Sequence, residues 1–386
     1  MIYLLLIFGA VGHVILWVML VNRLHALGMD RRWIDVLTGL CGVGVAVIPL
    51  AVAAVLYQGW FGSGNVPATV SAATWSYIAG CAVLSIIGIV RRVRMLRHPE
   101  RGGVVLANHT SHIKLSKDEG PLAAPGVASW LAHLPLNQAL DITVHEEQLK
   151  IPRLSAQYEG VRVAHLSDLH MSGRITKKYF ERMVEHVNRC EADVITITGD
   201  LVEREKCLDW IPDTLGRLHA PGGVFYVLGN HDRHVDEMRL HAALADAGLT
   251  YVGGTWRQIA IRNVPLILAG NEVPWYPPAA DLSDCPPHDA AGVPLRILLS
   301  HSPDQFAWAQ QHEVDLMLAG HNHGGQVCLP LLGAILAPSM QGVRYASGAF
   351  RAGNTVLHVS RGTSCLTPIR YNCPPEIALL VLRAGA

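Results

Sequence analysis

The stretch Val163–His170, with the sequence VAHLSDLH, is a short apolar run that ends in a carboxylate and an imidazole two residues apart. Apolar runs of this kind, bounded by serine or glycine, are typical of fully buried strands. Helical patterns over residues 176–190, 235–247 and 303–311 separate several further runs. The order strand, helix, strand predicts an α/β fold built on a parallel sheet.

Polar side chains follow each apolar run at the point where the strand should end. Five runs lead into residue types that can bind a metal, namely Asp168, His170, Asp200, Asn230, His301, His321 and His323. Ligands of parallel α/β sheets gather outside the carboxyl ends of the strands. We therefore expect these seven side chains to meet at one edge of one sheet, where its strands have their carboxyl ends.

Composition excludes several classes of protein. The chain has 386 residues, with 31 Lys and Arg against 31 Asp and Glu, so it lacks the net basic charge of a nucleic-acid-binding protein. Its eight cysteines show no paired spacing, which argues against a disulfide framework and a cysteine-rich zinc site. The length allows two or three domains.

Three apolar stretches occupy the front of the chain, at about residues 2–21, 36–57 and 71–90. Each is close to the roughly 20 residues that span a bilayer, and none contains Asp, Glu, Lys or Arg. The alternatives are a signal peptide for the first stretch and buried soluble helices for the others. Because Met1 leads directly into the apolar run without a positive leader, we favour three transmembrane helices over a cleaved signal.

Arginines in the connecting segments predict the orientation of these helices. The loop after the second stretch, residues 58–70, has no Lys or Arg, whereas basic residues crowd after the first and third: Arg23, Arg31, Arg32, Arg91, Arg92, Arg94, Arg97 and Arg101. The positive-inside rule then places the N-terminus outside and everything after residue 90 in the cytoplasm. The cluster after the third stretch could also contact anionic membrane lipids.

The rest of the chain divides into a linker and a catalytic domain. Residues 1–97 form the expected membrane anchor, and the Pro- and Gly-containing residues 98–138 are expected to be a juxtamembrane linker. The domain is expected over 139–386, with an edge strand at 139–144. Shorter strand patterns at 266–269, 355–360 and 376–382 indicate a second sheet packed on the first.

Five short motifs resemble those of the calcineurin-like metallophosphoesterases. They occur in the family's order and contain, in turn, Asp168-Leu-His170, Gly199-Asp200, Gly229-Asn230-His231-Asp232, Ser300-His301 and Gly320-His321-Asn322-His323. The similarity is greatest to the family's membrane-associated bacterial branch. The chain departs from the usual pattern at Glu203, where Asp is frequent, and at Asn322, where Thr is frequent. The resemblance implies a two-sheet α/β sandwich flanked by helices, here preceded by three transmembrane helices.

The resemblance also implies a site for two divalent metal ions. Asp200 would bridge the two, Asp168, His170 and His323 would complete one position, and the other would be completed by Asn230, His301 and His321. Two such cations lower the pKa of a water between them and hold the oxygens of an in-line displacement at phosphorus. Imidazole, carboxylate and amide ligands without thiolate suit manganese, iron or zinc, and manganese is favoured.

Two residues of the third motif are candidate catalytic groups. By its position next to Asn230, His231 is the expected proton donor to the leaving group, and Asp232 is expected to hold its ring by accepting a hydrogen bond. A protein that bound metal for structural reasons only would have no use for such a proton donor. That observation weighs against the alternative of a non-catalytic membrane sensor or scaffold.

The substrate is expected to be a phosphorylated or lipid-linked small molecule. The membrane-associated branch includes enzymes that cut the pyrophosphate of UDP-2,3-diacylglucosamine in lipid A biosynthesis, and an anchor would hold the site near such lipids. A lipid-linked pyrophosphate is therefore the leading interpretation. The alternative within the same enzyme class is a soluble ester such as a cyclic nucleotide.

Overall fold

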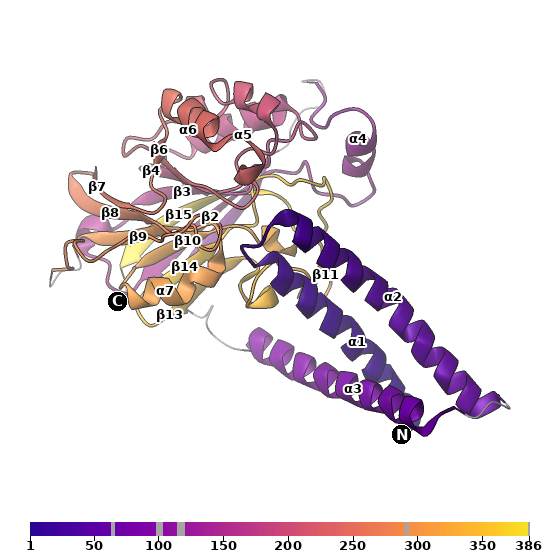
Figure 1. Ribbon diagram of the computed structural model, residues 1–386. Helices are drawn as coiled ribbons and strands as arrows, with labels where there is room; N and C mark the ends of the chain where they lie inside the picture. The colour runs from indigo at the N-terminus through magenta and orange to yellow at the C-terminus, as the bar shows by residue number, and fades with distance from the viewer. Residues whose placement is uncertain (63–65, 98–102, 114–119, 290–292, 385–386) are drawn as a thin grey trace. The chain divides into compact units, whose positions relative to one another are not determined.

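The computed structural model describes residues 1–62, 66–97, 103–113, 120–289 and 293–384, which form two compact units, Met1–His98 and Pro99–Ala386. The first unit holds three helices, α1 (Ile2–His25), α2 (Arg31–Phe61) and α3 (Ala68–Arg97) (Figure 1). All three are long and apolar enough to cross a membrane. They contain the expected stretches 2–21, 36–57 and 71–90 and extend beyond them into the flanking basic residues.

Helix α1 packs closely on α3 through small residues. A Cβ atom added at Gly12 would collide with the backbone of Cys81, so only glycine permits this approach. His13 is the next residue, and its buried ring lies 2.6 Å from the Tyr77 hydroxyl through Nδ1 and 3.2 Å from the Val45 carbonyl oxygen through Nε2. The three helices are therefore joined by both close packing and hydrogen bonds.

The second unit is built on two sheets, as expected. The seven-stranded sheet has the order β1 (Val105–His112), β2 (Thr143–Ile151), β15 (Glu376–Ala384), β3 (Arg162–Leu166), β4 (Val194–Thr198), β5 (Val224–Val227) and β6 (Thr250–Tyr251). The six-stranded sheet has the order β13 (Gly348–Ala352), β14 (Thr355–Val359), β10 (Leu316–Ala319), β9 (Leu295–Leu299), β8 (Val264–Gly270) and β7 (Trp256–Ile261). Strands β3, β4 and β5 pair in parallel, and so do β8, β9, β10 and β14.

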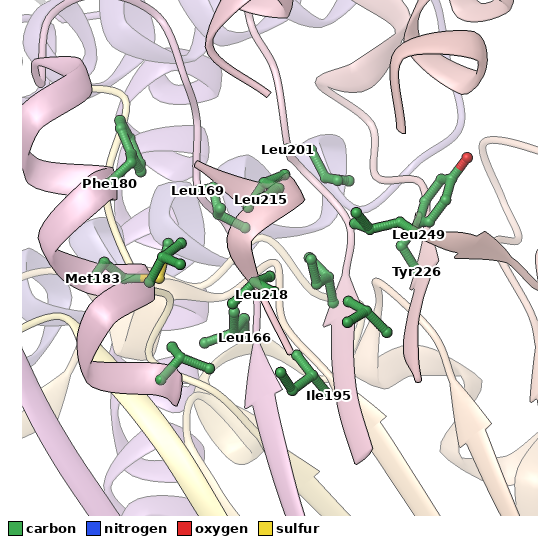
Figure 2. Close-up of a cluster of buried hydrophobic side chains, with 14 of the residues drawn as sticks. Leu166, Leu169, Phe180, Met183, Ile195, Leu201, Leu215, Leu218, Tyr226 and Leu249 are labelled. Carbon is green, nitrogen blue, oxygen red and sulfur yellow. The ribbon is translucent and has the colours of Figure 1, made fainter. Parts of the chain in front are cut away.

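Alternation along the strands divides their side chains between separate core layers. On β9, Ile297 packs between the two sheets while its neighbour Leu298 packs on the opposite face. Helices α5 (Lys177–Arg189) and α6 (Glu237–Asp246) cover the seven-stranded sheet, and α7 (Phe306–Gln311) packs on the six-stranded one (Figure 1). Figure 2 shows Phe180 and Met183 of α5 in the layer that also contains Leu166 and Ile195. The expected two-sheet α/β sandwich flanked by helices is confirmed.

The boundary between linker and domain differs from the expectation. Within the expected linker, β1 pairs in antiparallel register with β2 and so belongs to the seven-stranded sheet. The strand expected at 139–144 begins only at Thr143 and lies inside the sheet, not at its edge. Apart from Val105, the residues of β1 are exposed, so its sequence carries no alternating apolar pattern. Residues 98–102 and 114–119 of the expected linker, and Arg101 with them, lie outside the described residues.

The strands that lead into the candidate ligands are divided between the two sheets. Strands β3, β4 and β5 lie in one sheet, whereas β9 and β10 lie in the other. The expectation that one sheet supplies all the candidate ligands is therefore wrong. The last strand pattern, expected in the second sheet, also forms β15 within the first.

Candidate metal centre

The carboxyl ends of strands from both sheets supply the candidate ligands. Each ligand follows its strand by two to four residues: Asp168 and His170 after β3, Asp200 after β4, Asn230 after β5, His301 after β9, and His321 and His323 after β10. Six of the seven residues are buried or nearly so, although they are polar. The structure brings together all seven residues that the sequence singled out.

The backbone at these strand ends is held in an unusual conformation. Five of the seven residues have a positive φ, namely Asp168 (55°), His170 (47°), Asp200 (56°), His321 (69°) and His323 (48°). A left-handed backbone is uncommon for residues other than glycine, and it persists where the surrounding structure enforces it, typically at functional sites. Gly199, at φ +83°, has no room for a side chain, since a Cβ would lie 2.6 Å from Nδ1 of His301. The Gly-Asp motif therefore reflects a close approach of two strand ends.

One group of donors consists of Asp168, His170 and His323, whose ligand atoms all lie within 4.8 Å of one another. The Nε2 atoms of the two histidines are 2.9 Å apart, and Nε2 of His323 is 3.3 Å from Oδ1 of Asp168. Two imidazole nitrogens that face each other together with a carboxylate oxygen form a natural cation site.

A second group consists of Asp200, His301 and His321, also within 4.8 Å of one another. Nε2 of His301 lies 3.2 Å from Oδ2 of Asp200, 3.2 Å from Oδ1 of Asn230 and 3.2 Å from Nδ1 of His321. The same Oδ2 of Asp200 is 3.5 Å from Nε2 of His170 in the first group. Asp200 therefore faces both groups.

The donor set fits two divalent cations that share one carboxylate. It offers imidazole nitrogen, carboxylate oxygen and amide oxygen atoms and no thiolate, a mixture that suits manganese, iron or zinc. Backbone hydrogen bonds orient the carboxylates: Oδ1 of Asp200 accepts from the His231 amide at 2.9 Å, and Asp168 accepts from the His321 amide at 3.1 Å.

Charge in the centre favours the ionised form of Asp200, the carboxylate shared by the two groups. Burial raises the pKa of Asp200, but the neighbouring His301 and His231 outweigh burial and hold this pKa well below its ordinary value. For His301, burial lowers the pKa, but the charge of Asp200 prevails and raises it to about 9. A cation must therefore displace a proton from His301 at neutral pH, so metal affinity should fall as the pH falls.

The carboxylate beside His231 is Glu203, not Asp232 as expected. The two oxygens of Asp232 accept hydrogen bonds from the backbone amides of Asp200, Leu201, Val202 and Gly229, at 2.8–3.0 Å. Asp232 thus holds the Asp200 loop and is fully occupied. Glu203 instead forms an ion pair with Nδ1 of His231, and it lies 2.9 Å from Nδ1 of His170 and 3.0 Å from Nδ1 of His234.

We expect Glu203→Gln to weaken metal binding by about 10- to 100-fold, the usual effect of removing a carboxylate behind a ligating histidine. Glu203 fixes the ring of His170. Burial raises the pKa of Glu203, but hydrogen bonds and charge from the surrounding histidines outweigh burial and hold this pKa below its ordinary value, so Glu203 is anionic at neutral pH. Titration of manganese against activity measures the effect. The matched control is Glu205→Gln, which changes the same charge at a residue that pairs with Arg239. Equal manganese dependence in the two variants would contradict this assignment.

Two further residues of the centre were not singled out from the sequence. Arg370 is fully buried, and its guanidinium lies 3.2 Å from Nδ1 of His323 while donating to the carbonyl oxygens of Ser364 and Arg361. The ring of Trp275 lies against His321 and His301, with centroids 4.7 and 5.4 Å away. Neither follows an apolar strand pattern, so the signal that identified the ligands was absent for both.

Comparison with known proteins gives consistent matches. A family model described as calcineurin-like phosphoesterase matches residues 161–325. The phosphodiesterase YaeI of Escherichia coli is 31% identical over 226 residues, which are 57% of this chain and 82% of YaeI. The metallophosphoesterase YkuE of Bacillus subtilis is 28% identical over 288 residues, 69% of this chain and 93% of YkuE. The UDP-2,3-diacylglucosamine pyrophosphatase LpxG of Chlamydia trachomatis is 24% identical over 317 residues, 67% of this chain and 94% of LpxG.

Proposed function

The chain belongs to the calcineurin-like phosphoesterase family, and from that premise we propose that it is a membrane-anchored phosphohydrolase that acts on a lipid-linked pyrophosphate. That it is a metallophosphoesterase follows from the family. The observation that supports catalysis most directly is the convergence of seven donor side chains from two sheets into two adjacent groups that share Asp200.

Each residue has a distinct role in this proposal. When bound, two divalent cations lower the pKa of water and offset negative charge on the phosphoryl oxygens. Asp168, His170 and His323 would hold one cation, Asn230, His301 and His321 would hold the other, and Asp200 would be shared; manganese is the favoured metal. His231 gives a proton to the leaving oxygen, and its side chain is 18% exposed, so a substrate can reach it. Asp232 keeps the Asp200 loop in position through four backbone amides.

The membrane anchor supports a lipid-linked substrate. Residues 1–97 would hold the catalytic domain on the cytoplasmic side of the inner membrane, where lipid-linked phosphates reach a high effective concentration. The relative LpxG is named for the pyrophosphate of a diacylated sugar nucleotide. The second candidate is a soluble phosphodiester such as a cyclic nucleotide, and the relative YaeI is named a phosphodiesterase.

A substrate panel tests this proposal. The full chain, reconstituted in nanodiscs with manganese, iron or zinc, is offered UDP-2,3-diacylglucosamine, cyclic nucleotides and an aryl phosphodiester. We expect kcat/KM for the lipid to exceed that for the cyclic nucleotides by at least about tenfold, because the lipid shares the bilayer with the enzyme. Equal or better turnover of the cyclic nucleotides would reverse the ranking. Asp200→Asn protein serves as the inactive control.

Reporter fusions test the proposed orientation. A reporter active only in the cytoplasm, fused to the C-terminus, should give signal, since the arginine-rich segments flank the ends of the spans that should face inward. Activity of a periplasmic reporter at the same position would overturn the cytoplasmic assignment.

A further inference from the structure

An apolar hairpin follows the last candidate ligand by only a few residues. Strands β11 (Cys328–Leu329) and β12 (Gly333–Ala334) pair in antiparallel register, and the hairpin with its flanks (327–336, the apolar hairpin) carries six exposed large apolar side chains: Val327, Leu329, Leu331, Leu332, Ile335 and Leu336. Leu331, at the tip, is 96% exposed. A contiguous group of exposed apolar side chains marks a surface that contacts a membrane or another protein.

A second exposed apolar element borders the same part of the domain. Helix α4 (Val127–Ala132) and the residues after it (127–136, the α4 segment) expose Val127 (72%), Trp130 (65%) and Leu136 (75%). Exposed tryptophan beside aliphatic residues is typical of membrane-interface surfaces, where one part of the ring is apolar and its N–H stays wet.

One stretch of chain, residues 368–373, joins the two elements. On one side Gln138, just after the α4 segment, donates its amide to the Arg370 carbonyl oxygen at 2.8 Å. On the other side Cys328 of the hairpin donates its amide to the Tyr371 carbonyl oxygen at 2.9 Å. Between them the Arg370 guanidinium reaches His323 of the metal centre. The two apolar elements therefore flank the first donor group.

The charge of this surface suits an anionic bilayer. No Asp or Glu occurs from residue 316 to residue 375, a stretch that includes four arginines, and residues 120–140 contain no charged residue apart from His133 if it is protonated. Arg344, eight residues after the apolar hairpin, is exposed. The apolar hairpin and the α4 segment themselves carry no carboxylate that anionic headgroups would repel, and an exposed arginine is attracted to such headgroups.

A bilayer is within reach of the domain if the proposed anchor spans it. Helix α3 ends at Arg97 and β1 begins at Val105, and the eight Cα–Cα steps between these two residues reach roughly 30 Å at most. We propose that the apolar hairpin and the α4 segment together insert into the interface of the lipid bilayer that the helices of the same chain cross. This inference rests on the proposed membrane anchor, and it adds that the metal centre opens beside the lipid surface.

Depth-dependent fluorescence quenching tests the insertion without any substrate. A fluorescent amino acid is placed at Leu331 in the full chain, with one copy per nanodisc, and lipids spin-labelled on their acyl chains serve as quenchers. The matched control position is Met238, which is 81% exposed on α6. We expect quenching at residue 331 to exceed that at residue 238 several-fold and its emission to shift to the blue. Equal quenching at the two positions would overturn the proposal.

A second copy of the chain is the other possible occupant, and the same sample distinguishes it. Emission that shifts only in discs with two copies, without quenching by lipid, would assign the surface to a dimer and overturn the lipid assignment. Failure of the chain to enter nanodiscs would count against the proposed anchor. The anchor is separate from the docking surface, by which we mean the apolar hairpin together with the α4 segment.

Activity provides an independent measurement. The double variant Leu331→Asp, Leu332→Asp should raise KM for the lipid-linked pyrophosphate at least about tenfold, because each leucine withdrawn from water contributes on the order of one tenfold step to partitioning. Turnover of the soluble aryl phosphodiester should be unchanged, and Met238→Asp should change neither. Loss of both activities would indicate misfolding, and an unchanged KM would overturn the docking surface. If no lipid substrate were cleaved even by the unmodified chain, the proposed substrate would fail while the quenching result still stood.

Discussion

Asp200→Asn should lower kcat/KM for an aryl phosphodiester by about a thousandfold or more at saturating manganese. Oδ2 of Asp200 faces His301 at 3.2 Å and His170 at 3.5 Å, so the shared carboxylate balances charge in both donor groups. Asparagine keeps the shape and can still accept the amide of His231, which Oδ1 of Asp200 now does at 2.9 Å. Only the charge is lost, and charge stabilisation at the reacting centre is usually the largest single contribution to catalysis.

The measurement pairs kinetics with metal content. Elemental analysis should show fewer bound manganese ions per chain in the variant, whereas Asp209→Asn, the same charge change at an exposed position of the chain, should retain both activity and metal. An Asp200→Asn protein that binds manganese and turns over normally would remove the basis for the two-metal centre.

The candidate ligands could be predicted from the sequence because each one closely follows an apolar strand pattern. A buried strand has a recognisable apolar composition, and a polar residue at its carboxyl end cannot continue that pattern. Asp168 after β3 and His301 after β9 are therefore visible without a structure. Their assignment to separate sheets was not visible, since buried strands have the same composition in either sheet.

Other parts of the structure depend on contacts that leave no pattern in the sequence. Strand β1 is held by backbone hydrogen bonds to β2 and exposes nearly all its side chains, so nothing in its composition marks it as a strand of the catalytic sheet. Arg370 is fully buried, a rare state for arginine, because backbone carbonyl oxygens surround its guanidinium. The role of Glu203 could not be predicted for a different reason. Asp232 is adjacent to His231 in sequence and was therefore expected to be its partner, but its carboxylate accepts hydrogen bonds from backbone amides instead.

His231→Ala should reduce turnover in a way that depends on the leaving group. A positioned proton donor contributes about 10²- to 10⁴-fold when the leaving oxygen is basic, as in an alkyl or phenyl ester. The loss should shrink to less than about tenfold for a p-nitrophenyl ester, because that phenolate leaves without a proton and the donor has little to contribute. The ion pair with Glu203 occupies Nδ1 of His231, which leaves Nε2 as the atom that can carry the proton.

The control for this experiment is the neighbouring histidine. His234 contacts the same carboxylate, with Nδ1 3.0 Å from Oε2 of Glu203, but its chain position lies beyond the motif that carries Asn230. His234→Ala should therefore change turnover of both esters by no more than a few fold. A loss in His231→Ala of equal size for phenyl and p-nitrophenyl esters would contradict proton donation. Since ligand atoms of His231, His170 and Asp200 lie within 4.8 Å of one another, such a result would instead make His231 part of the metal-binding set.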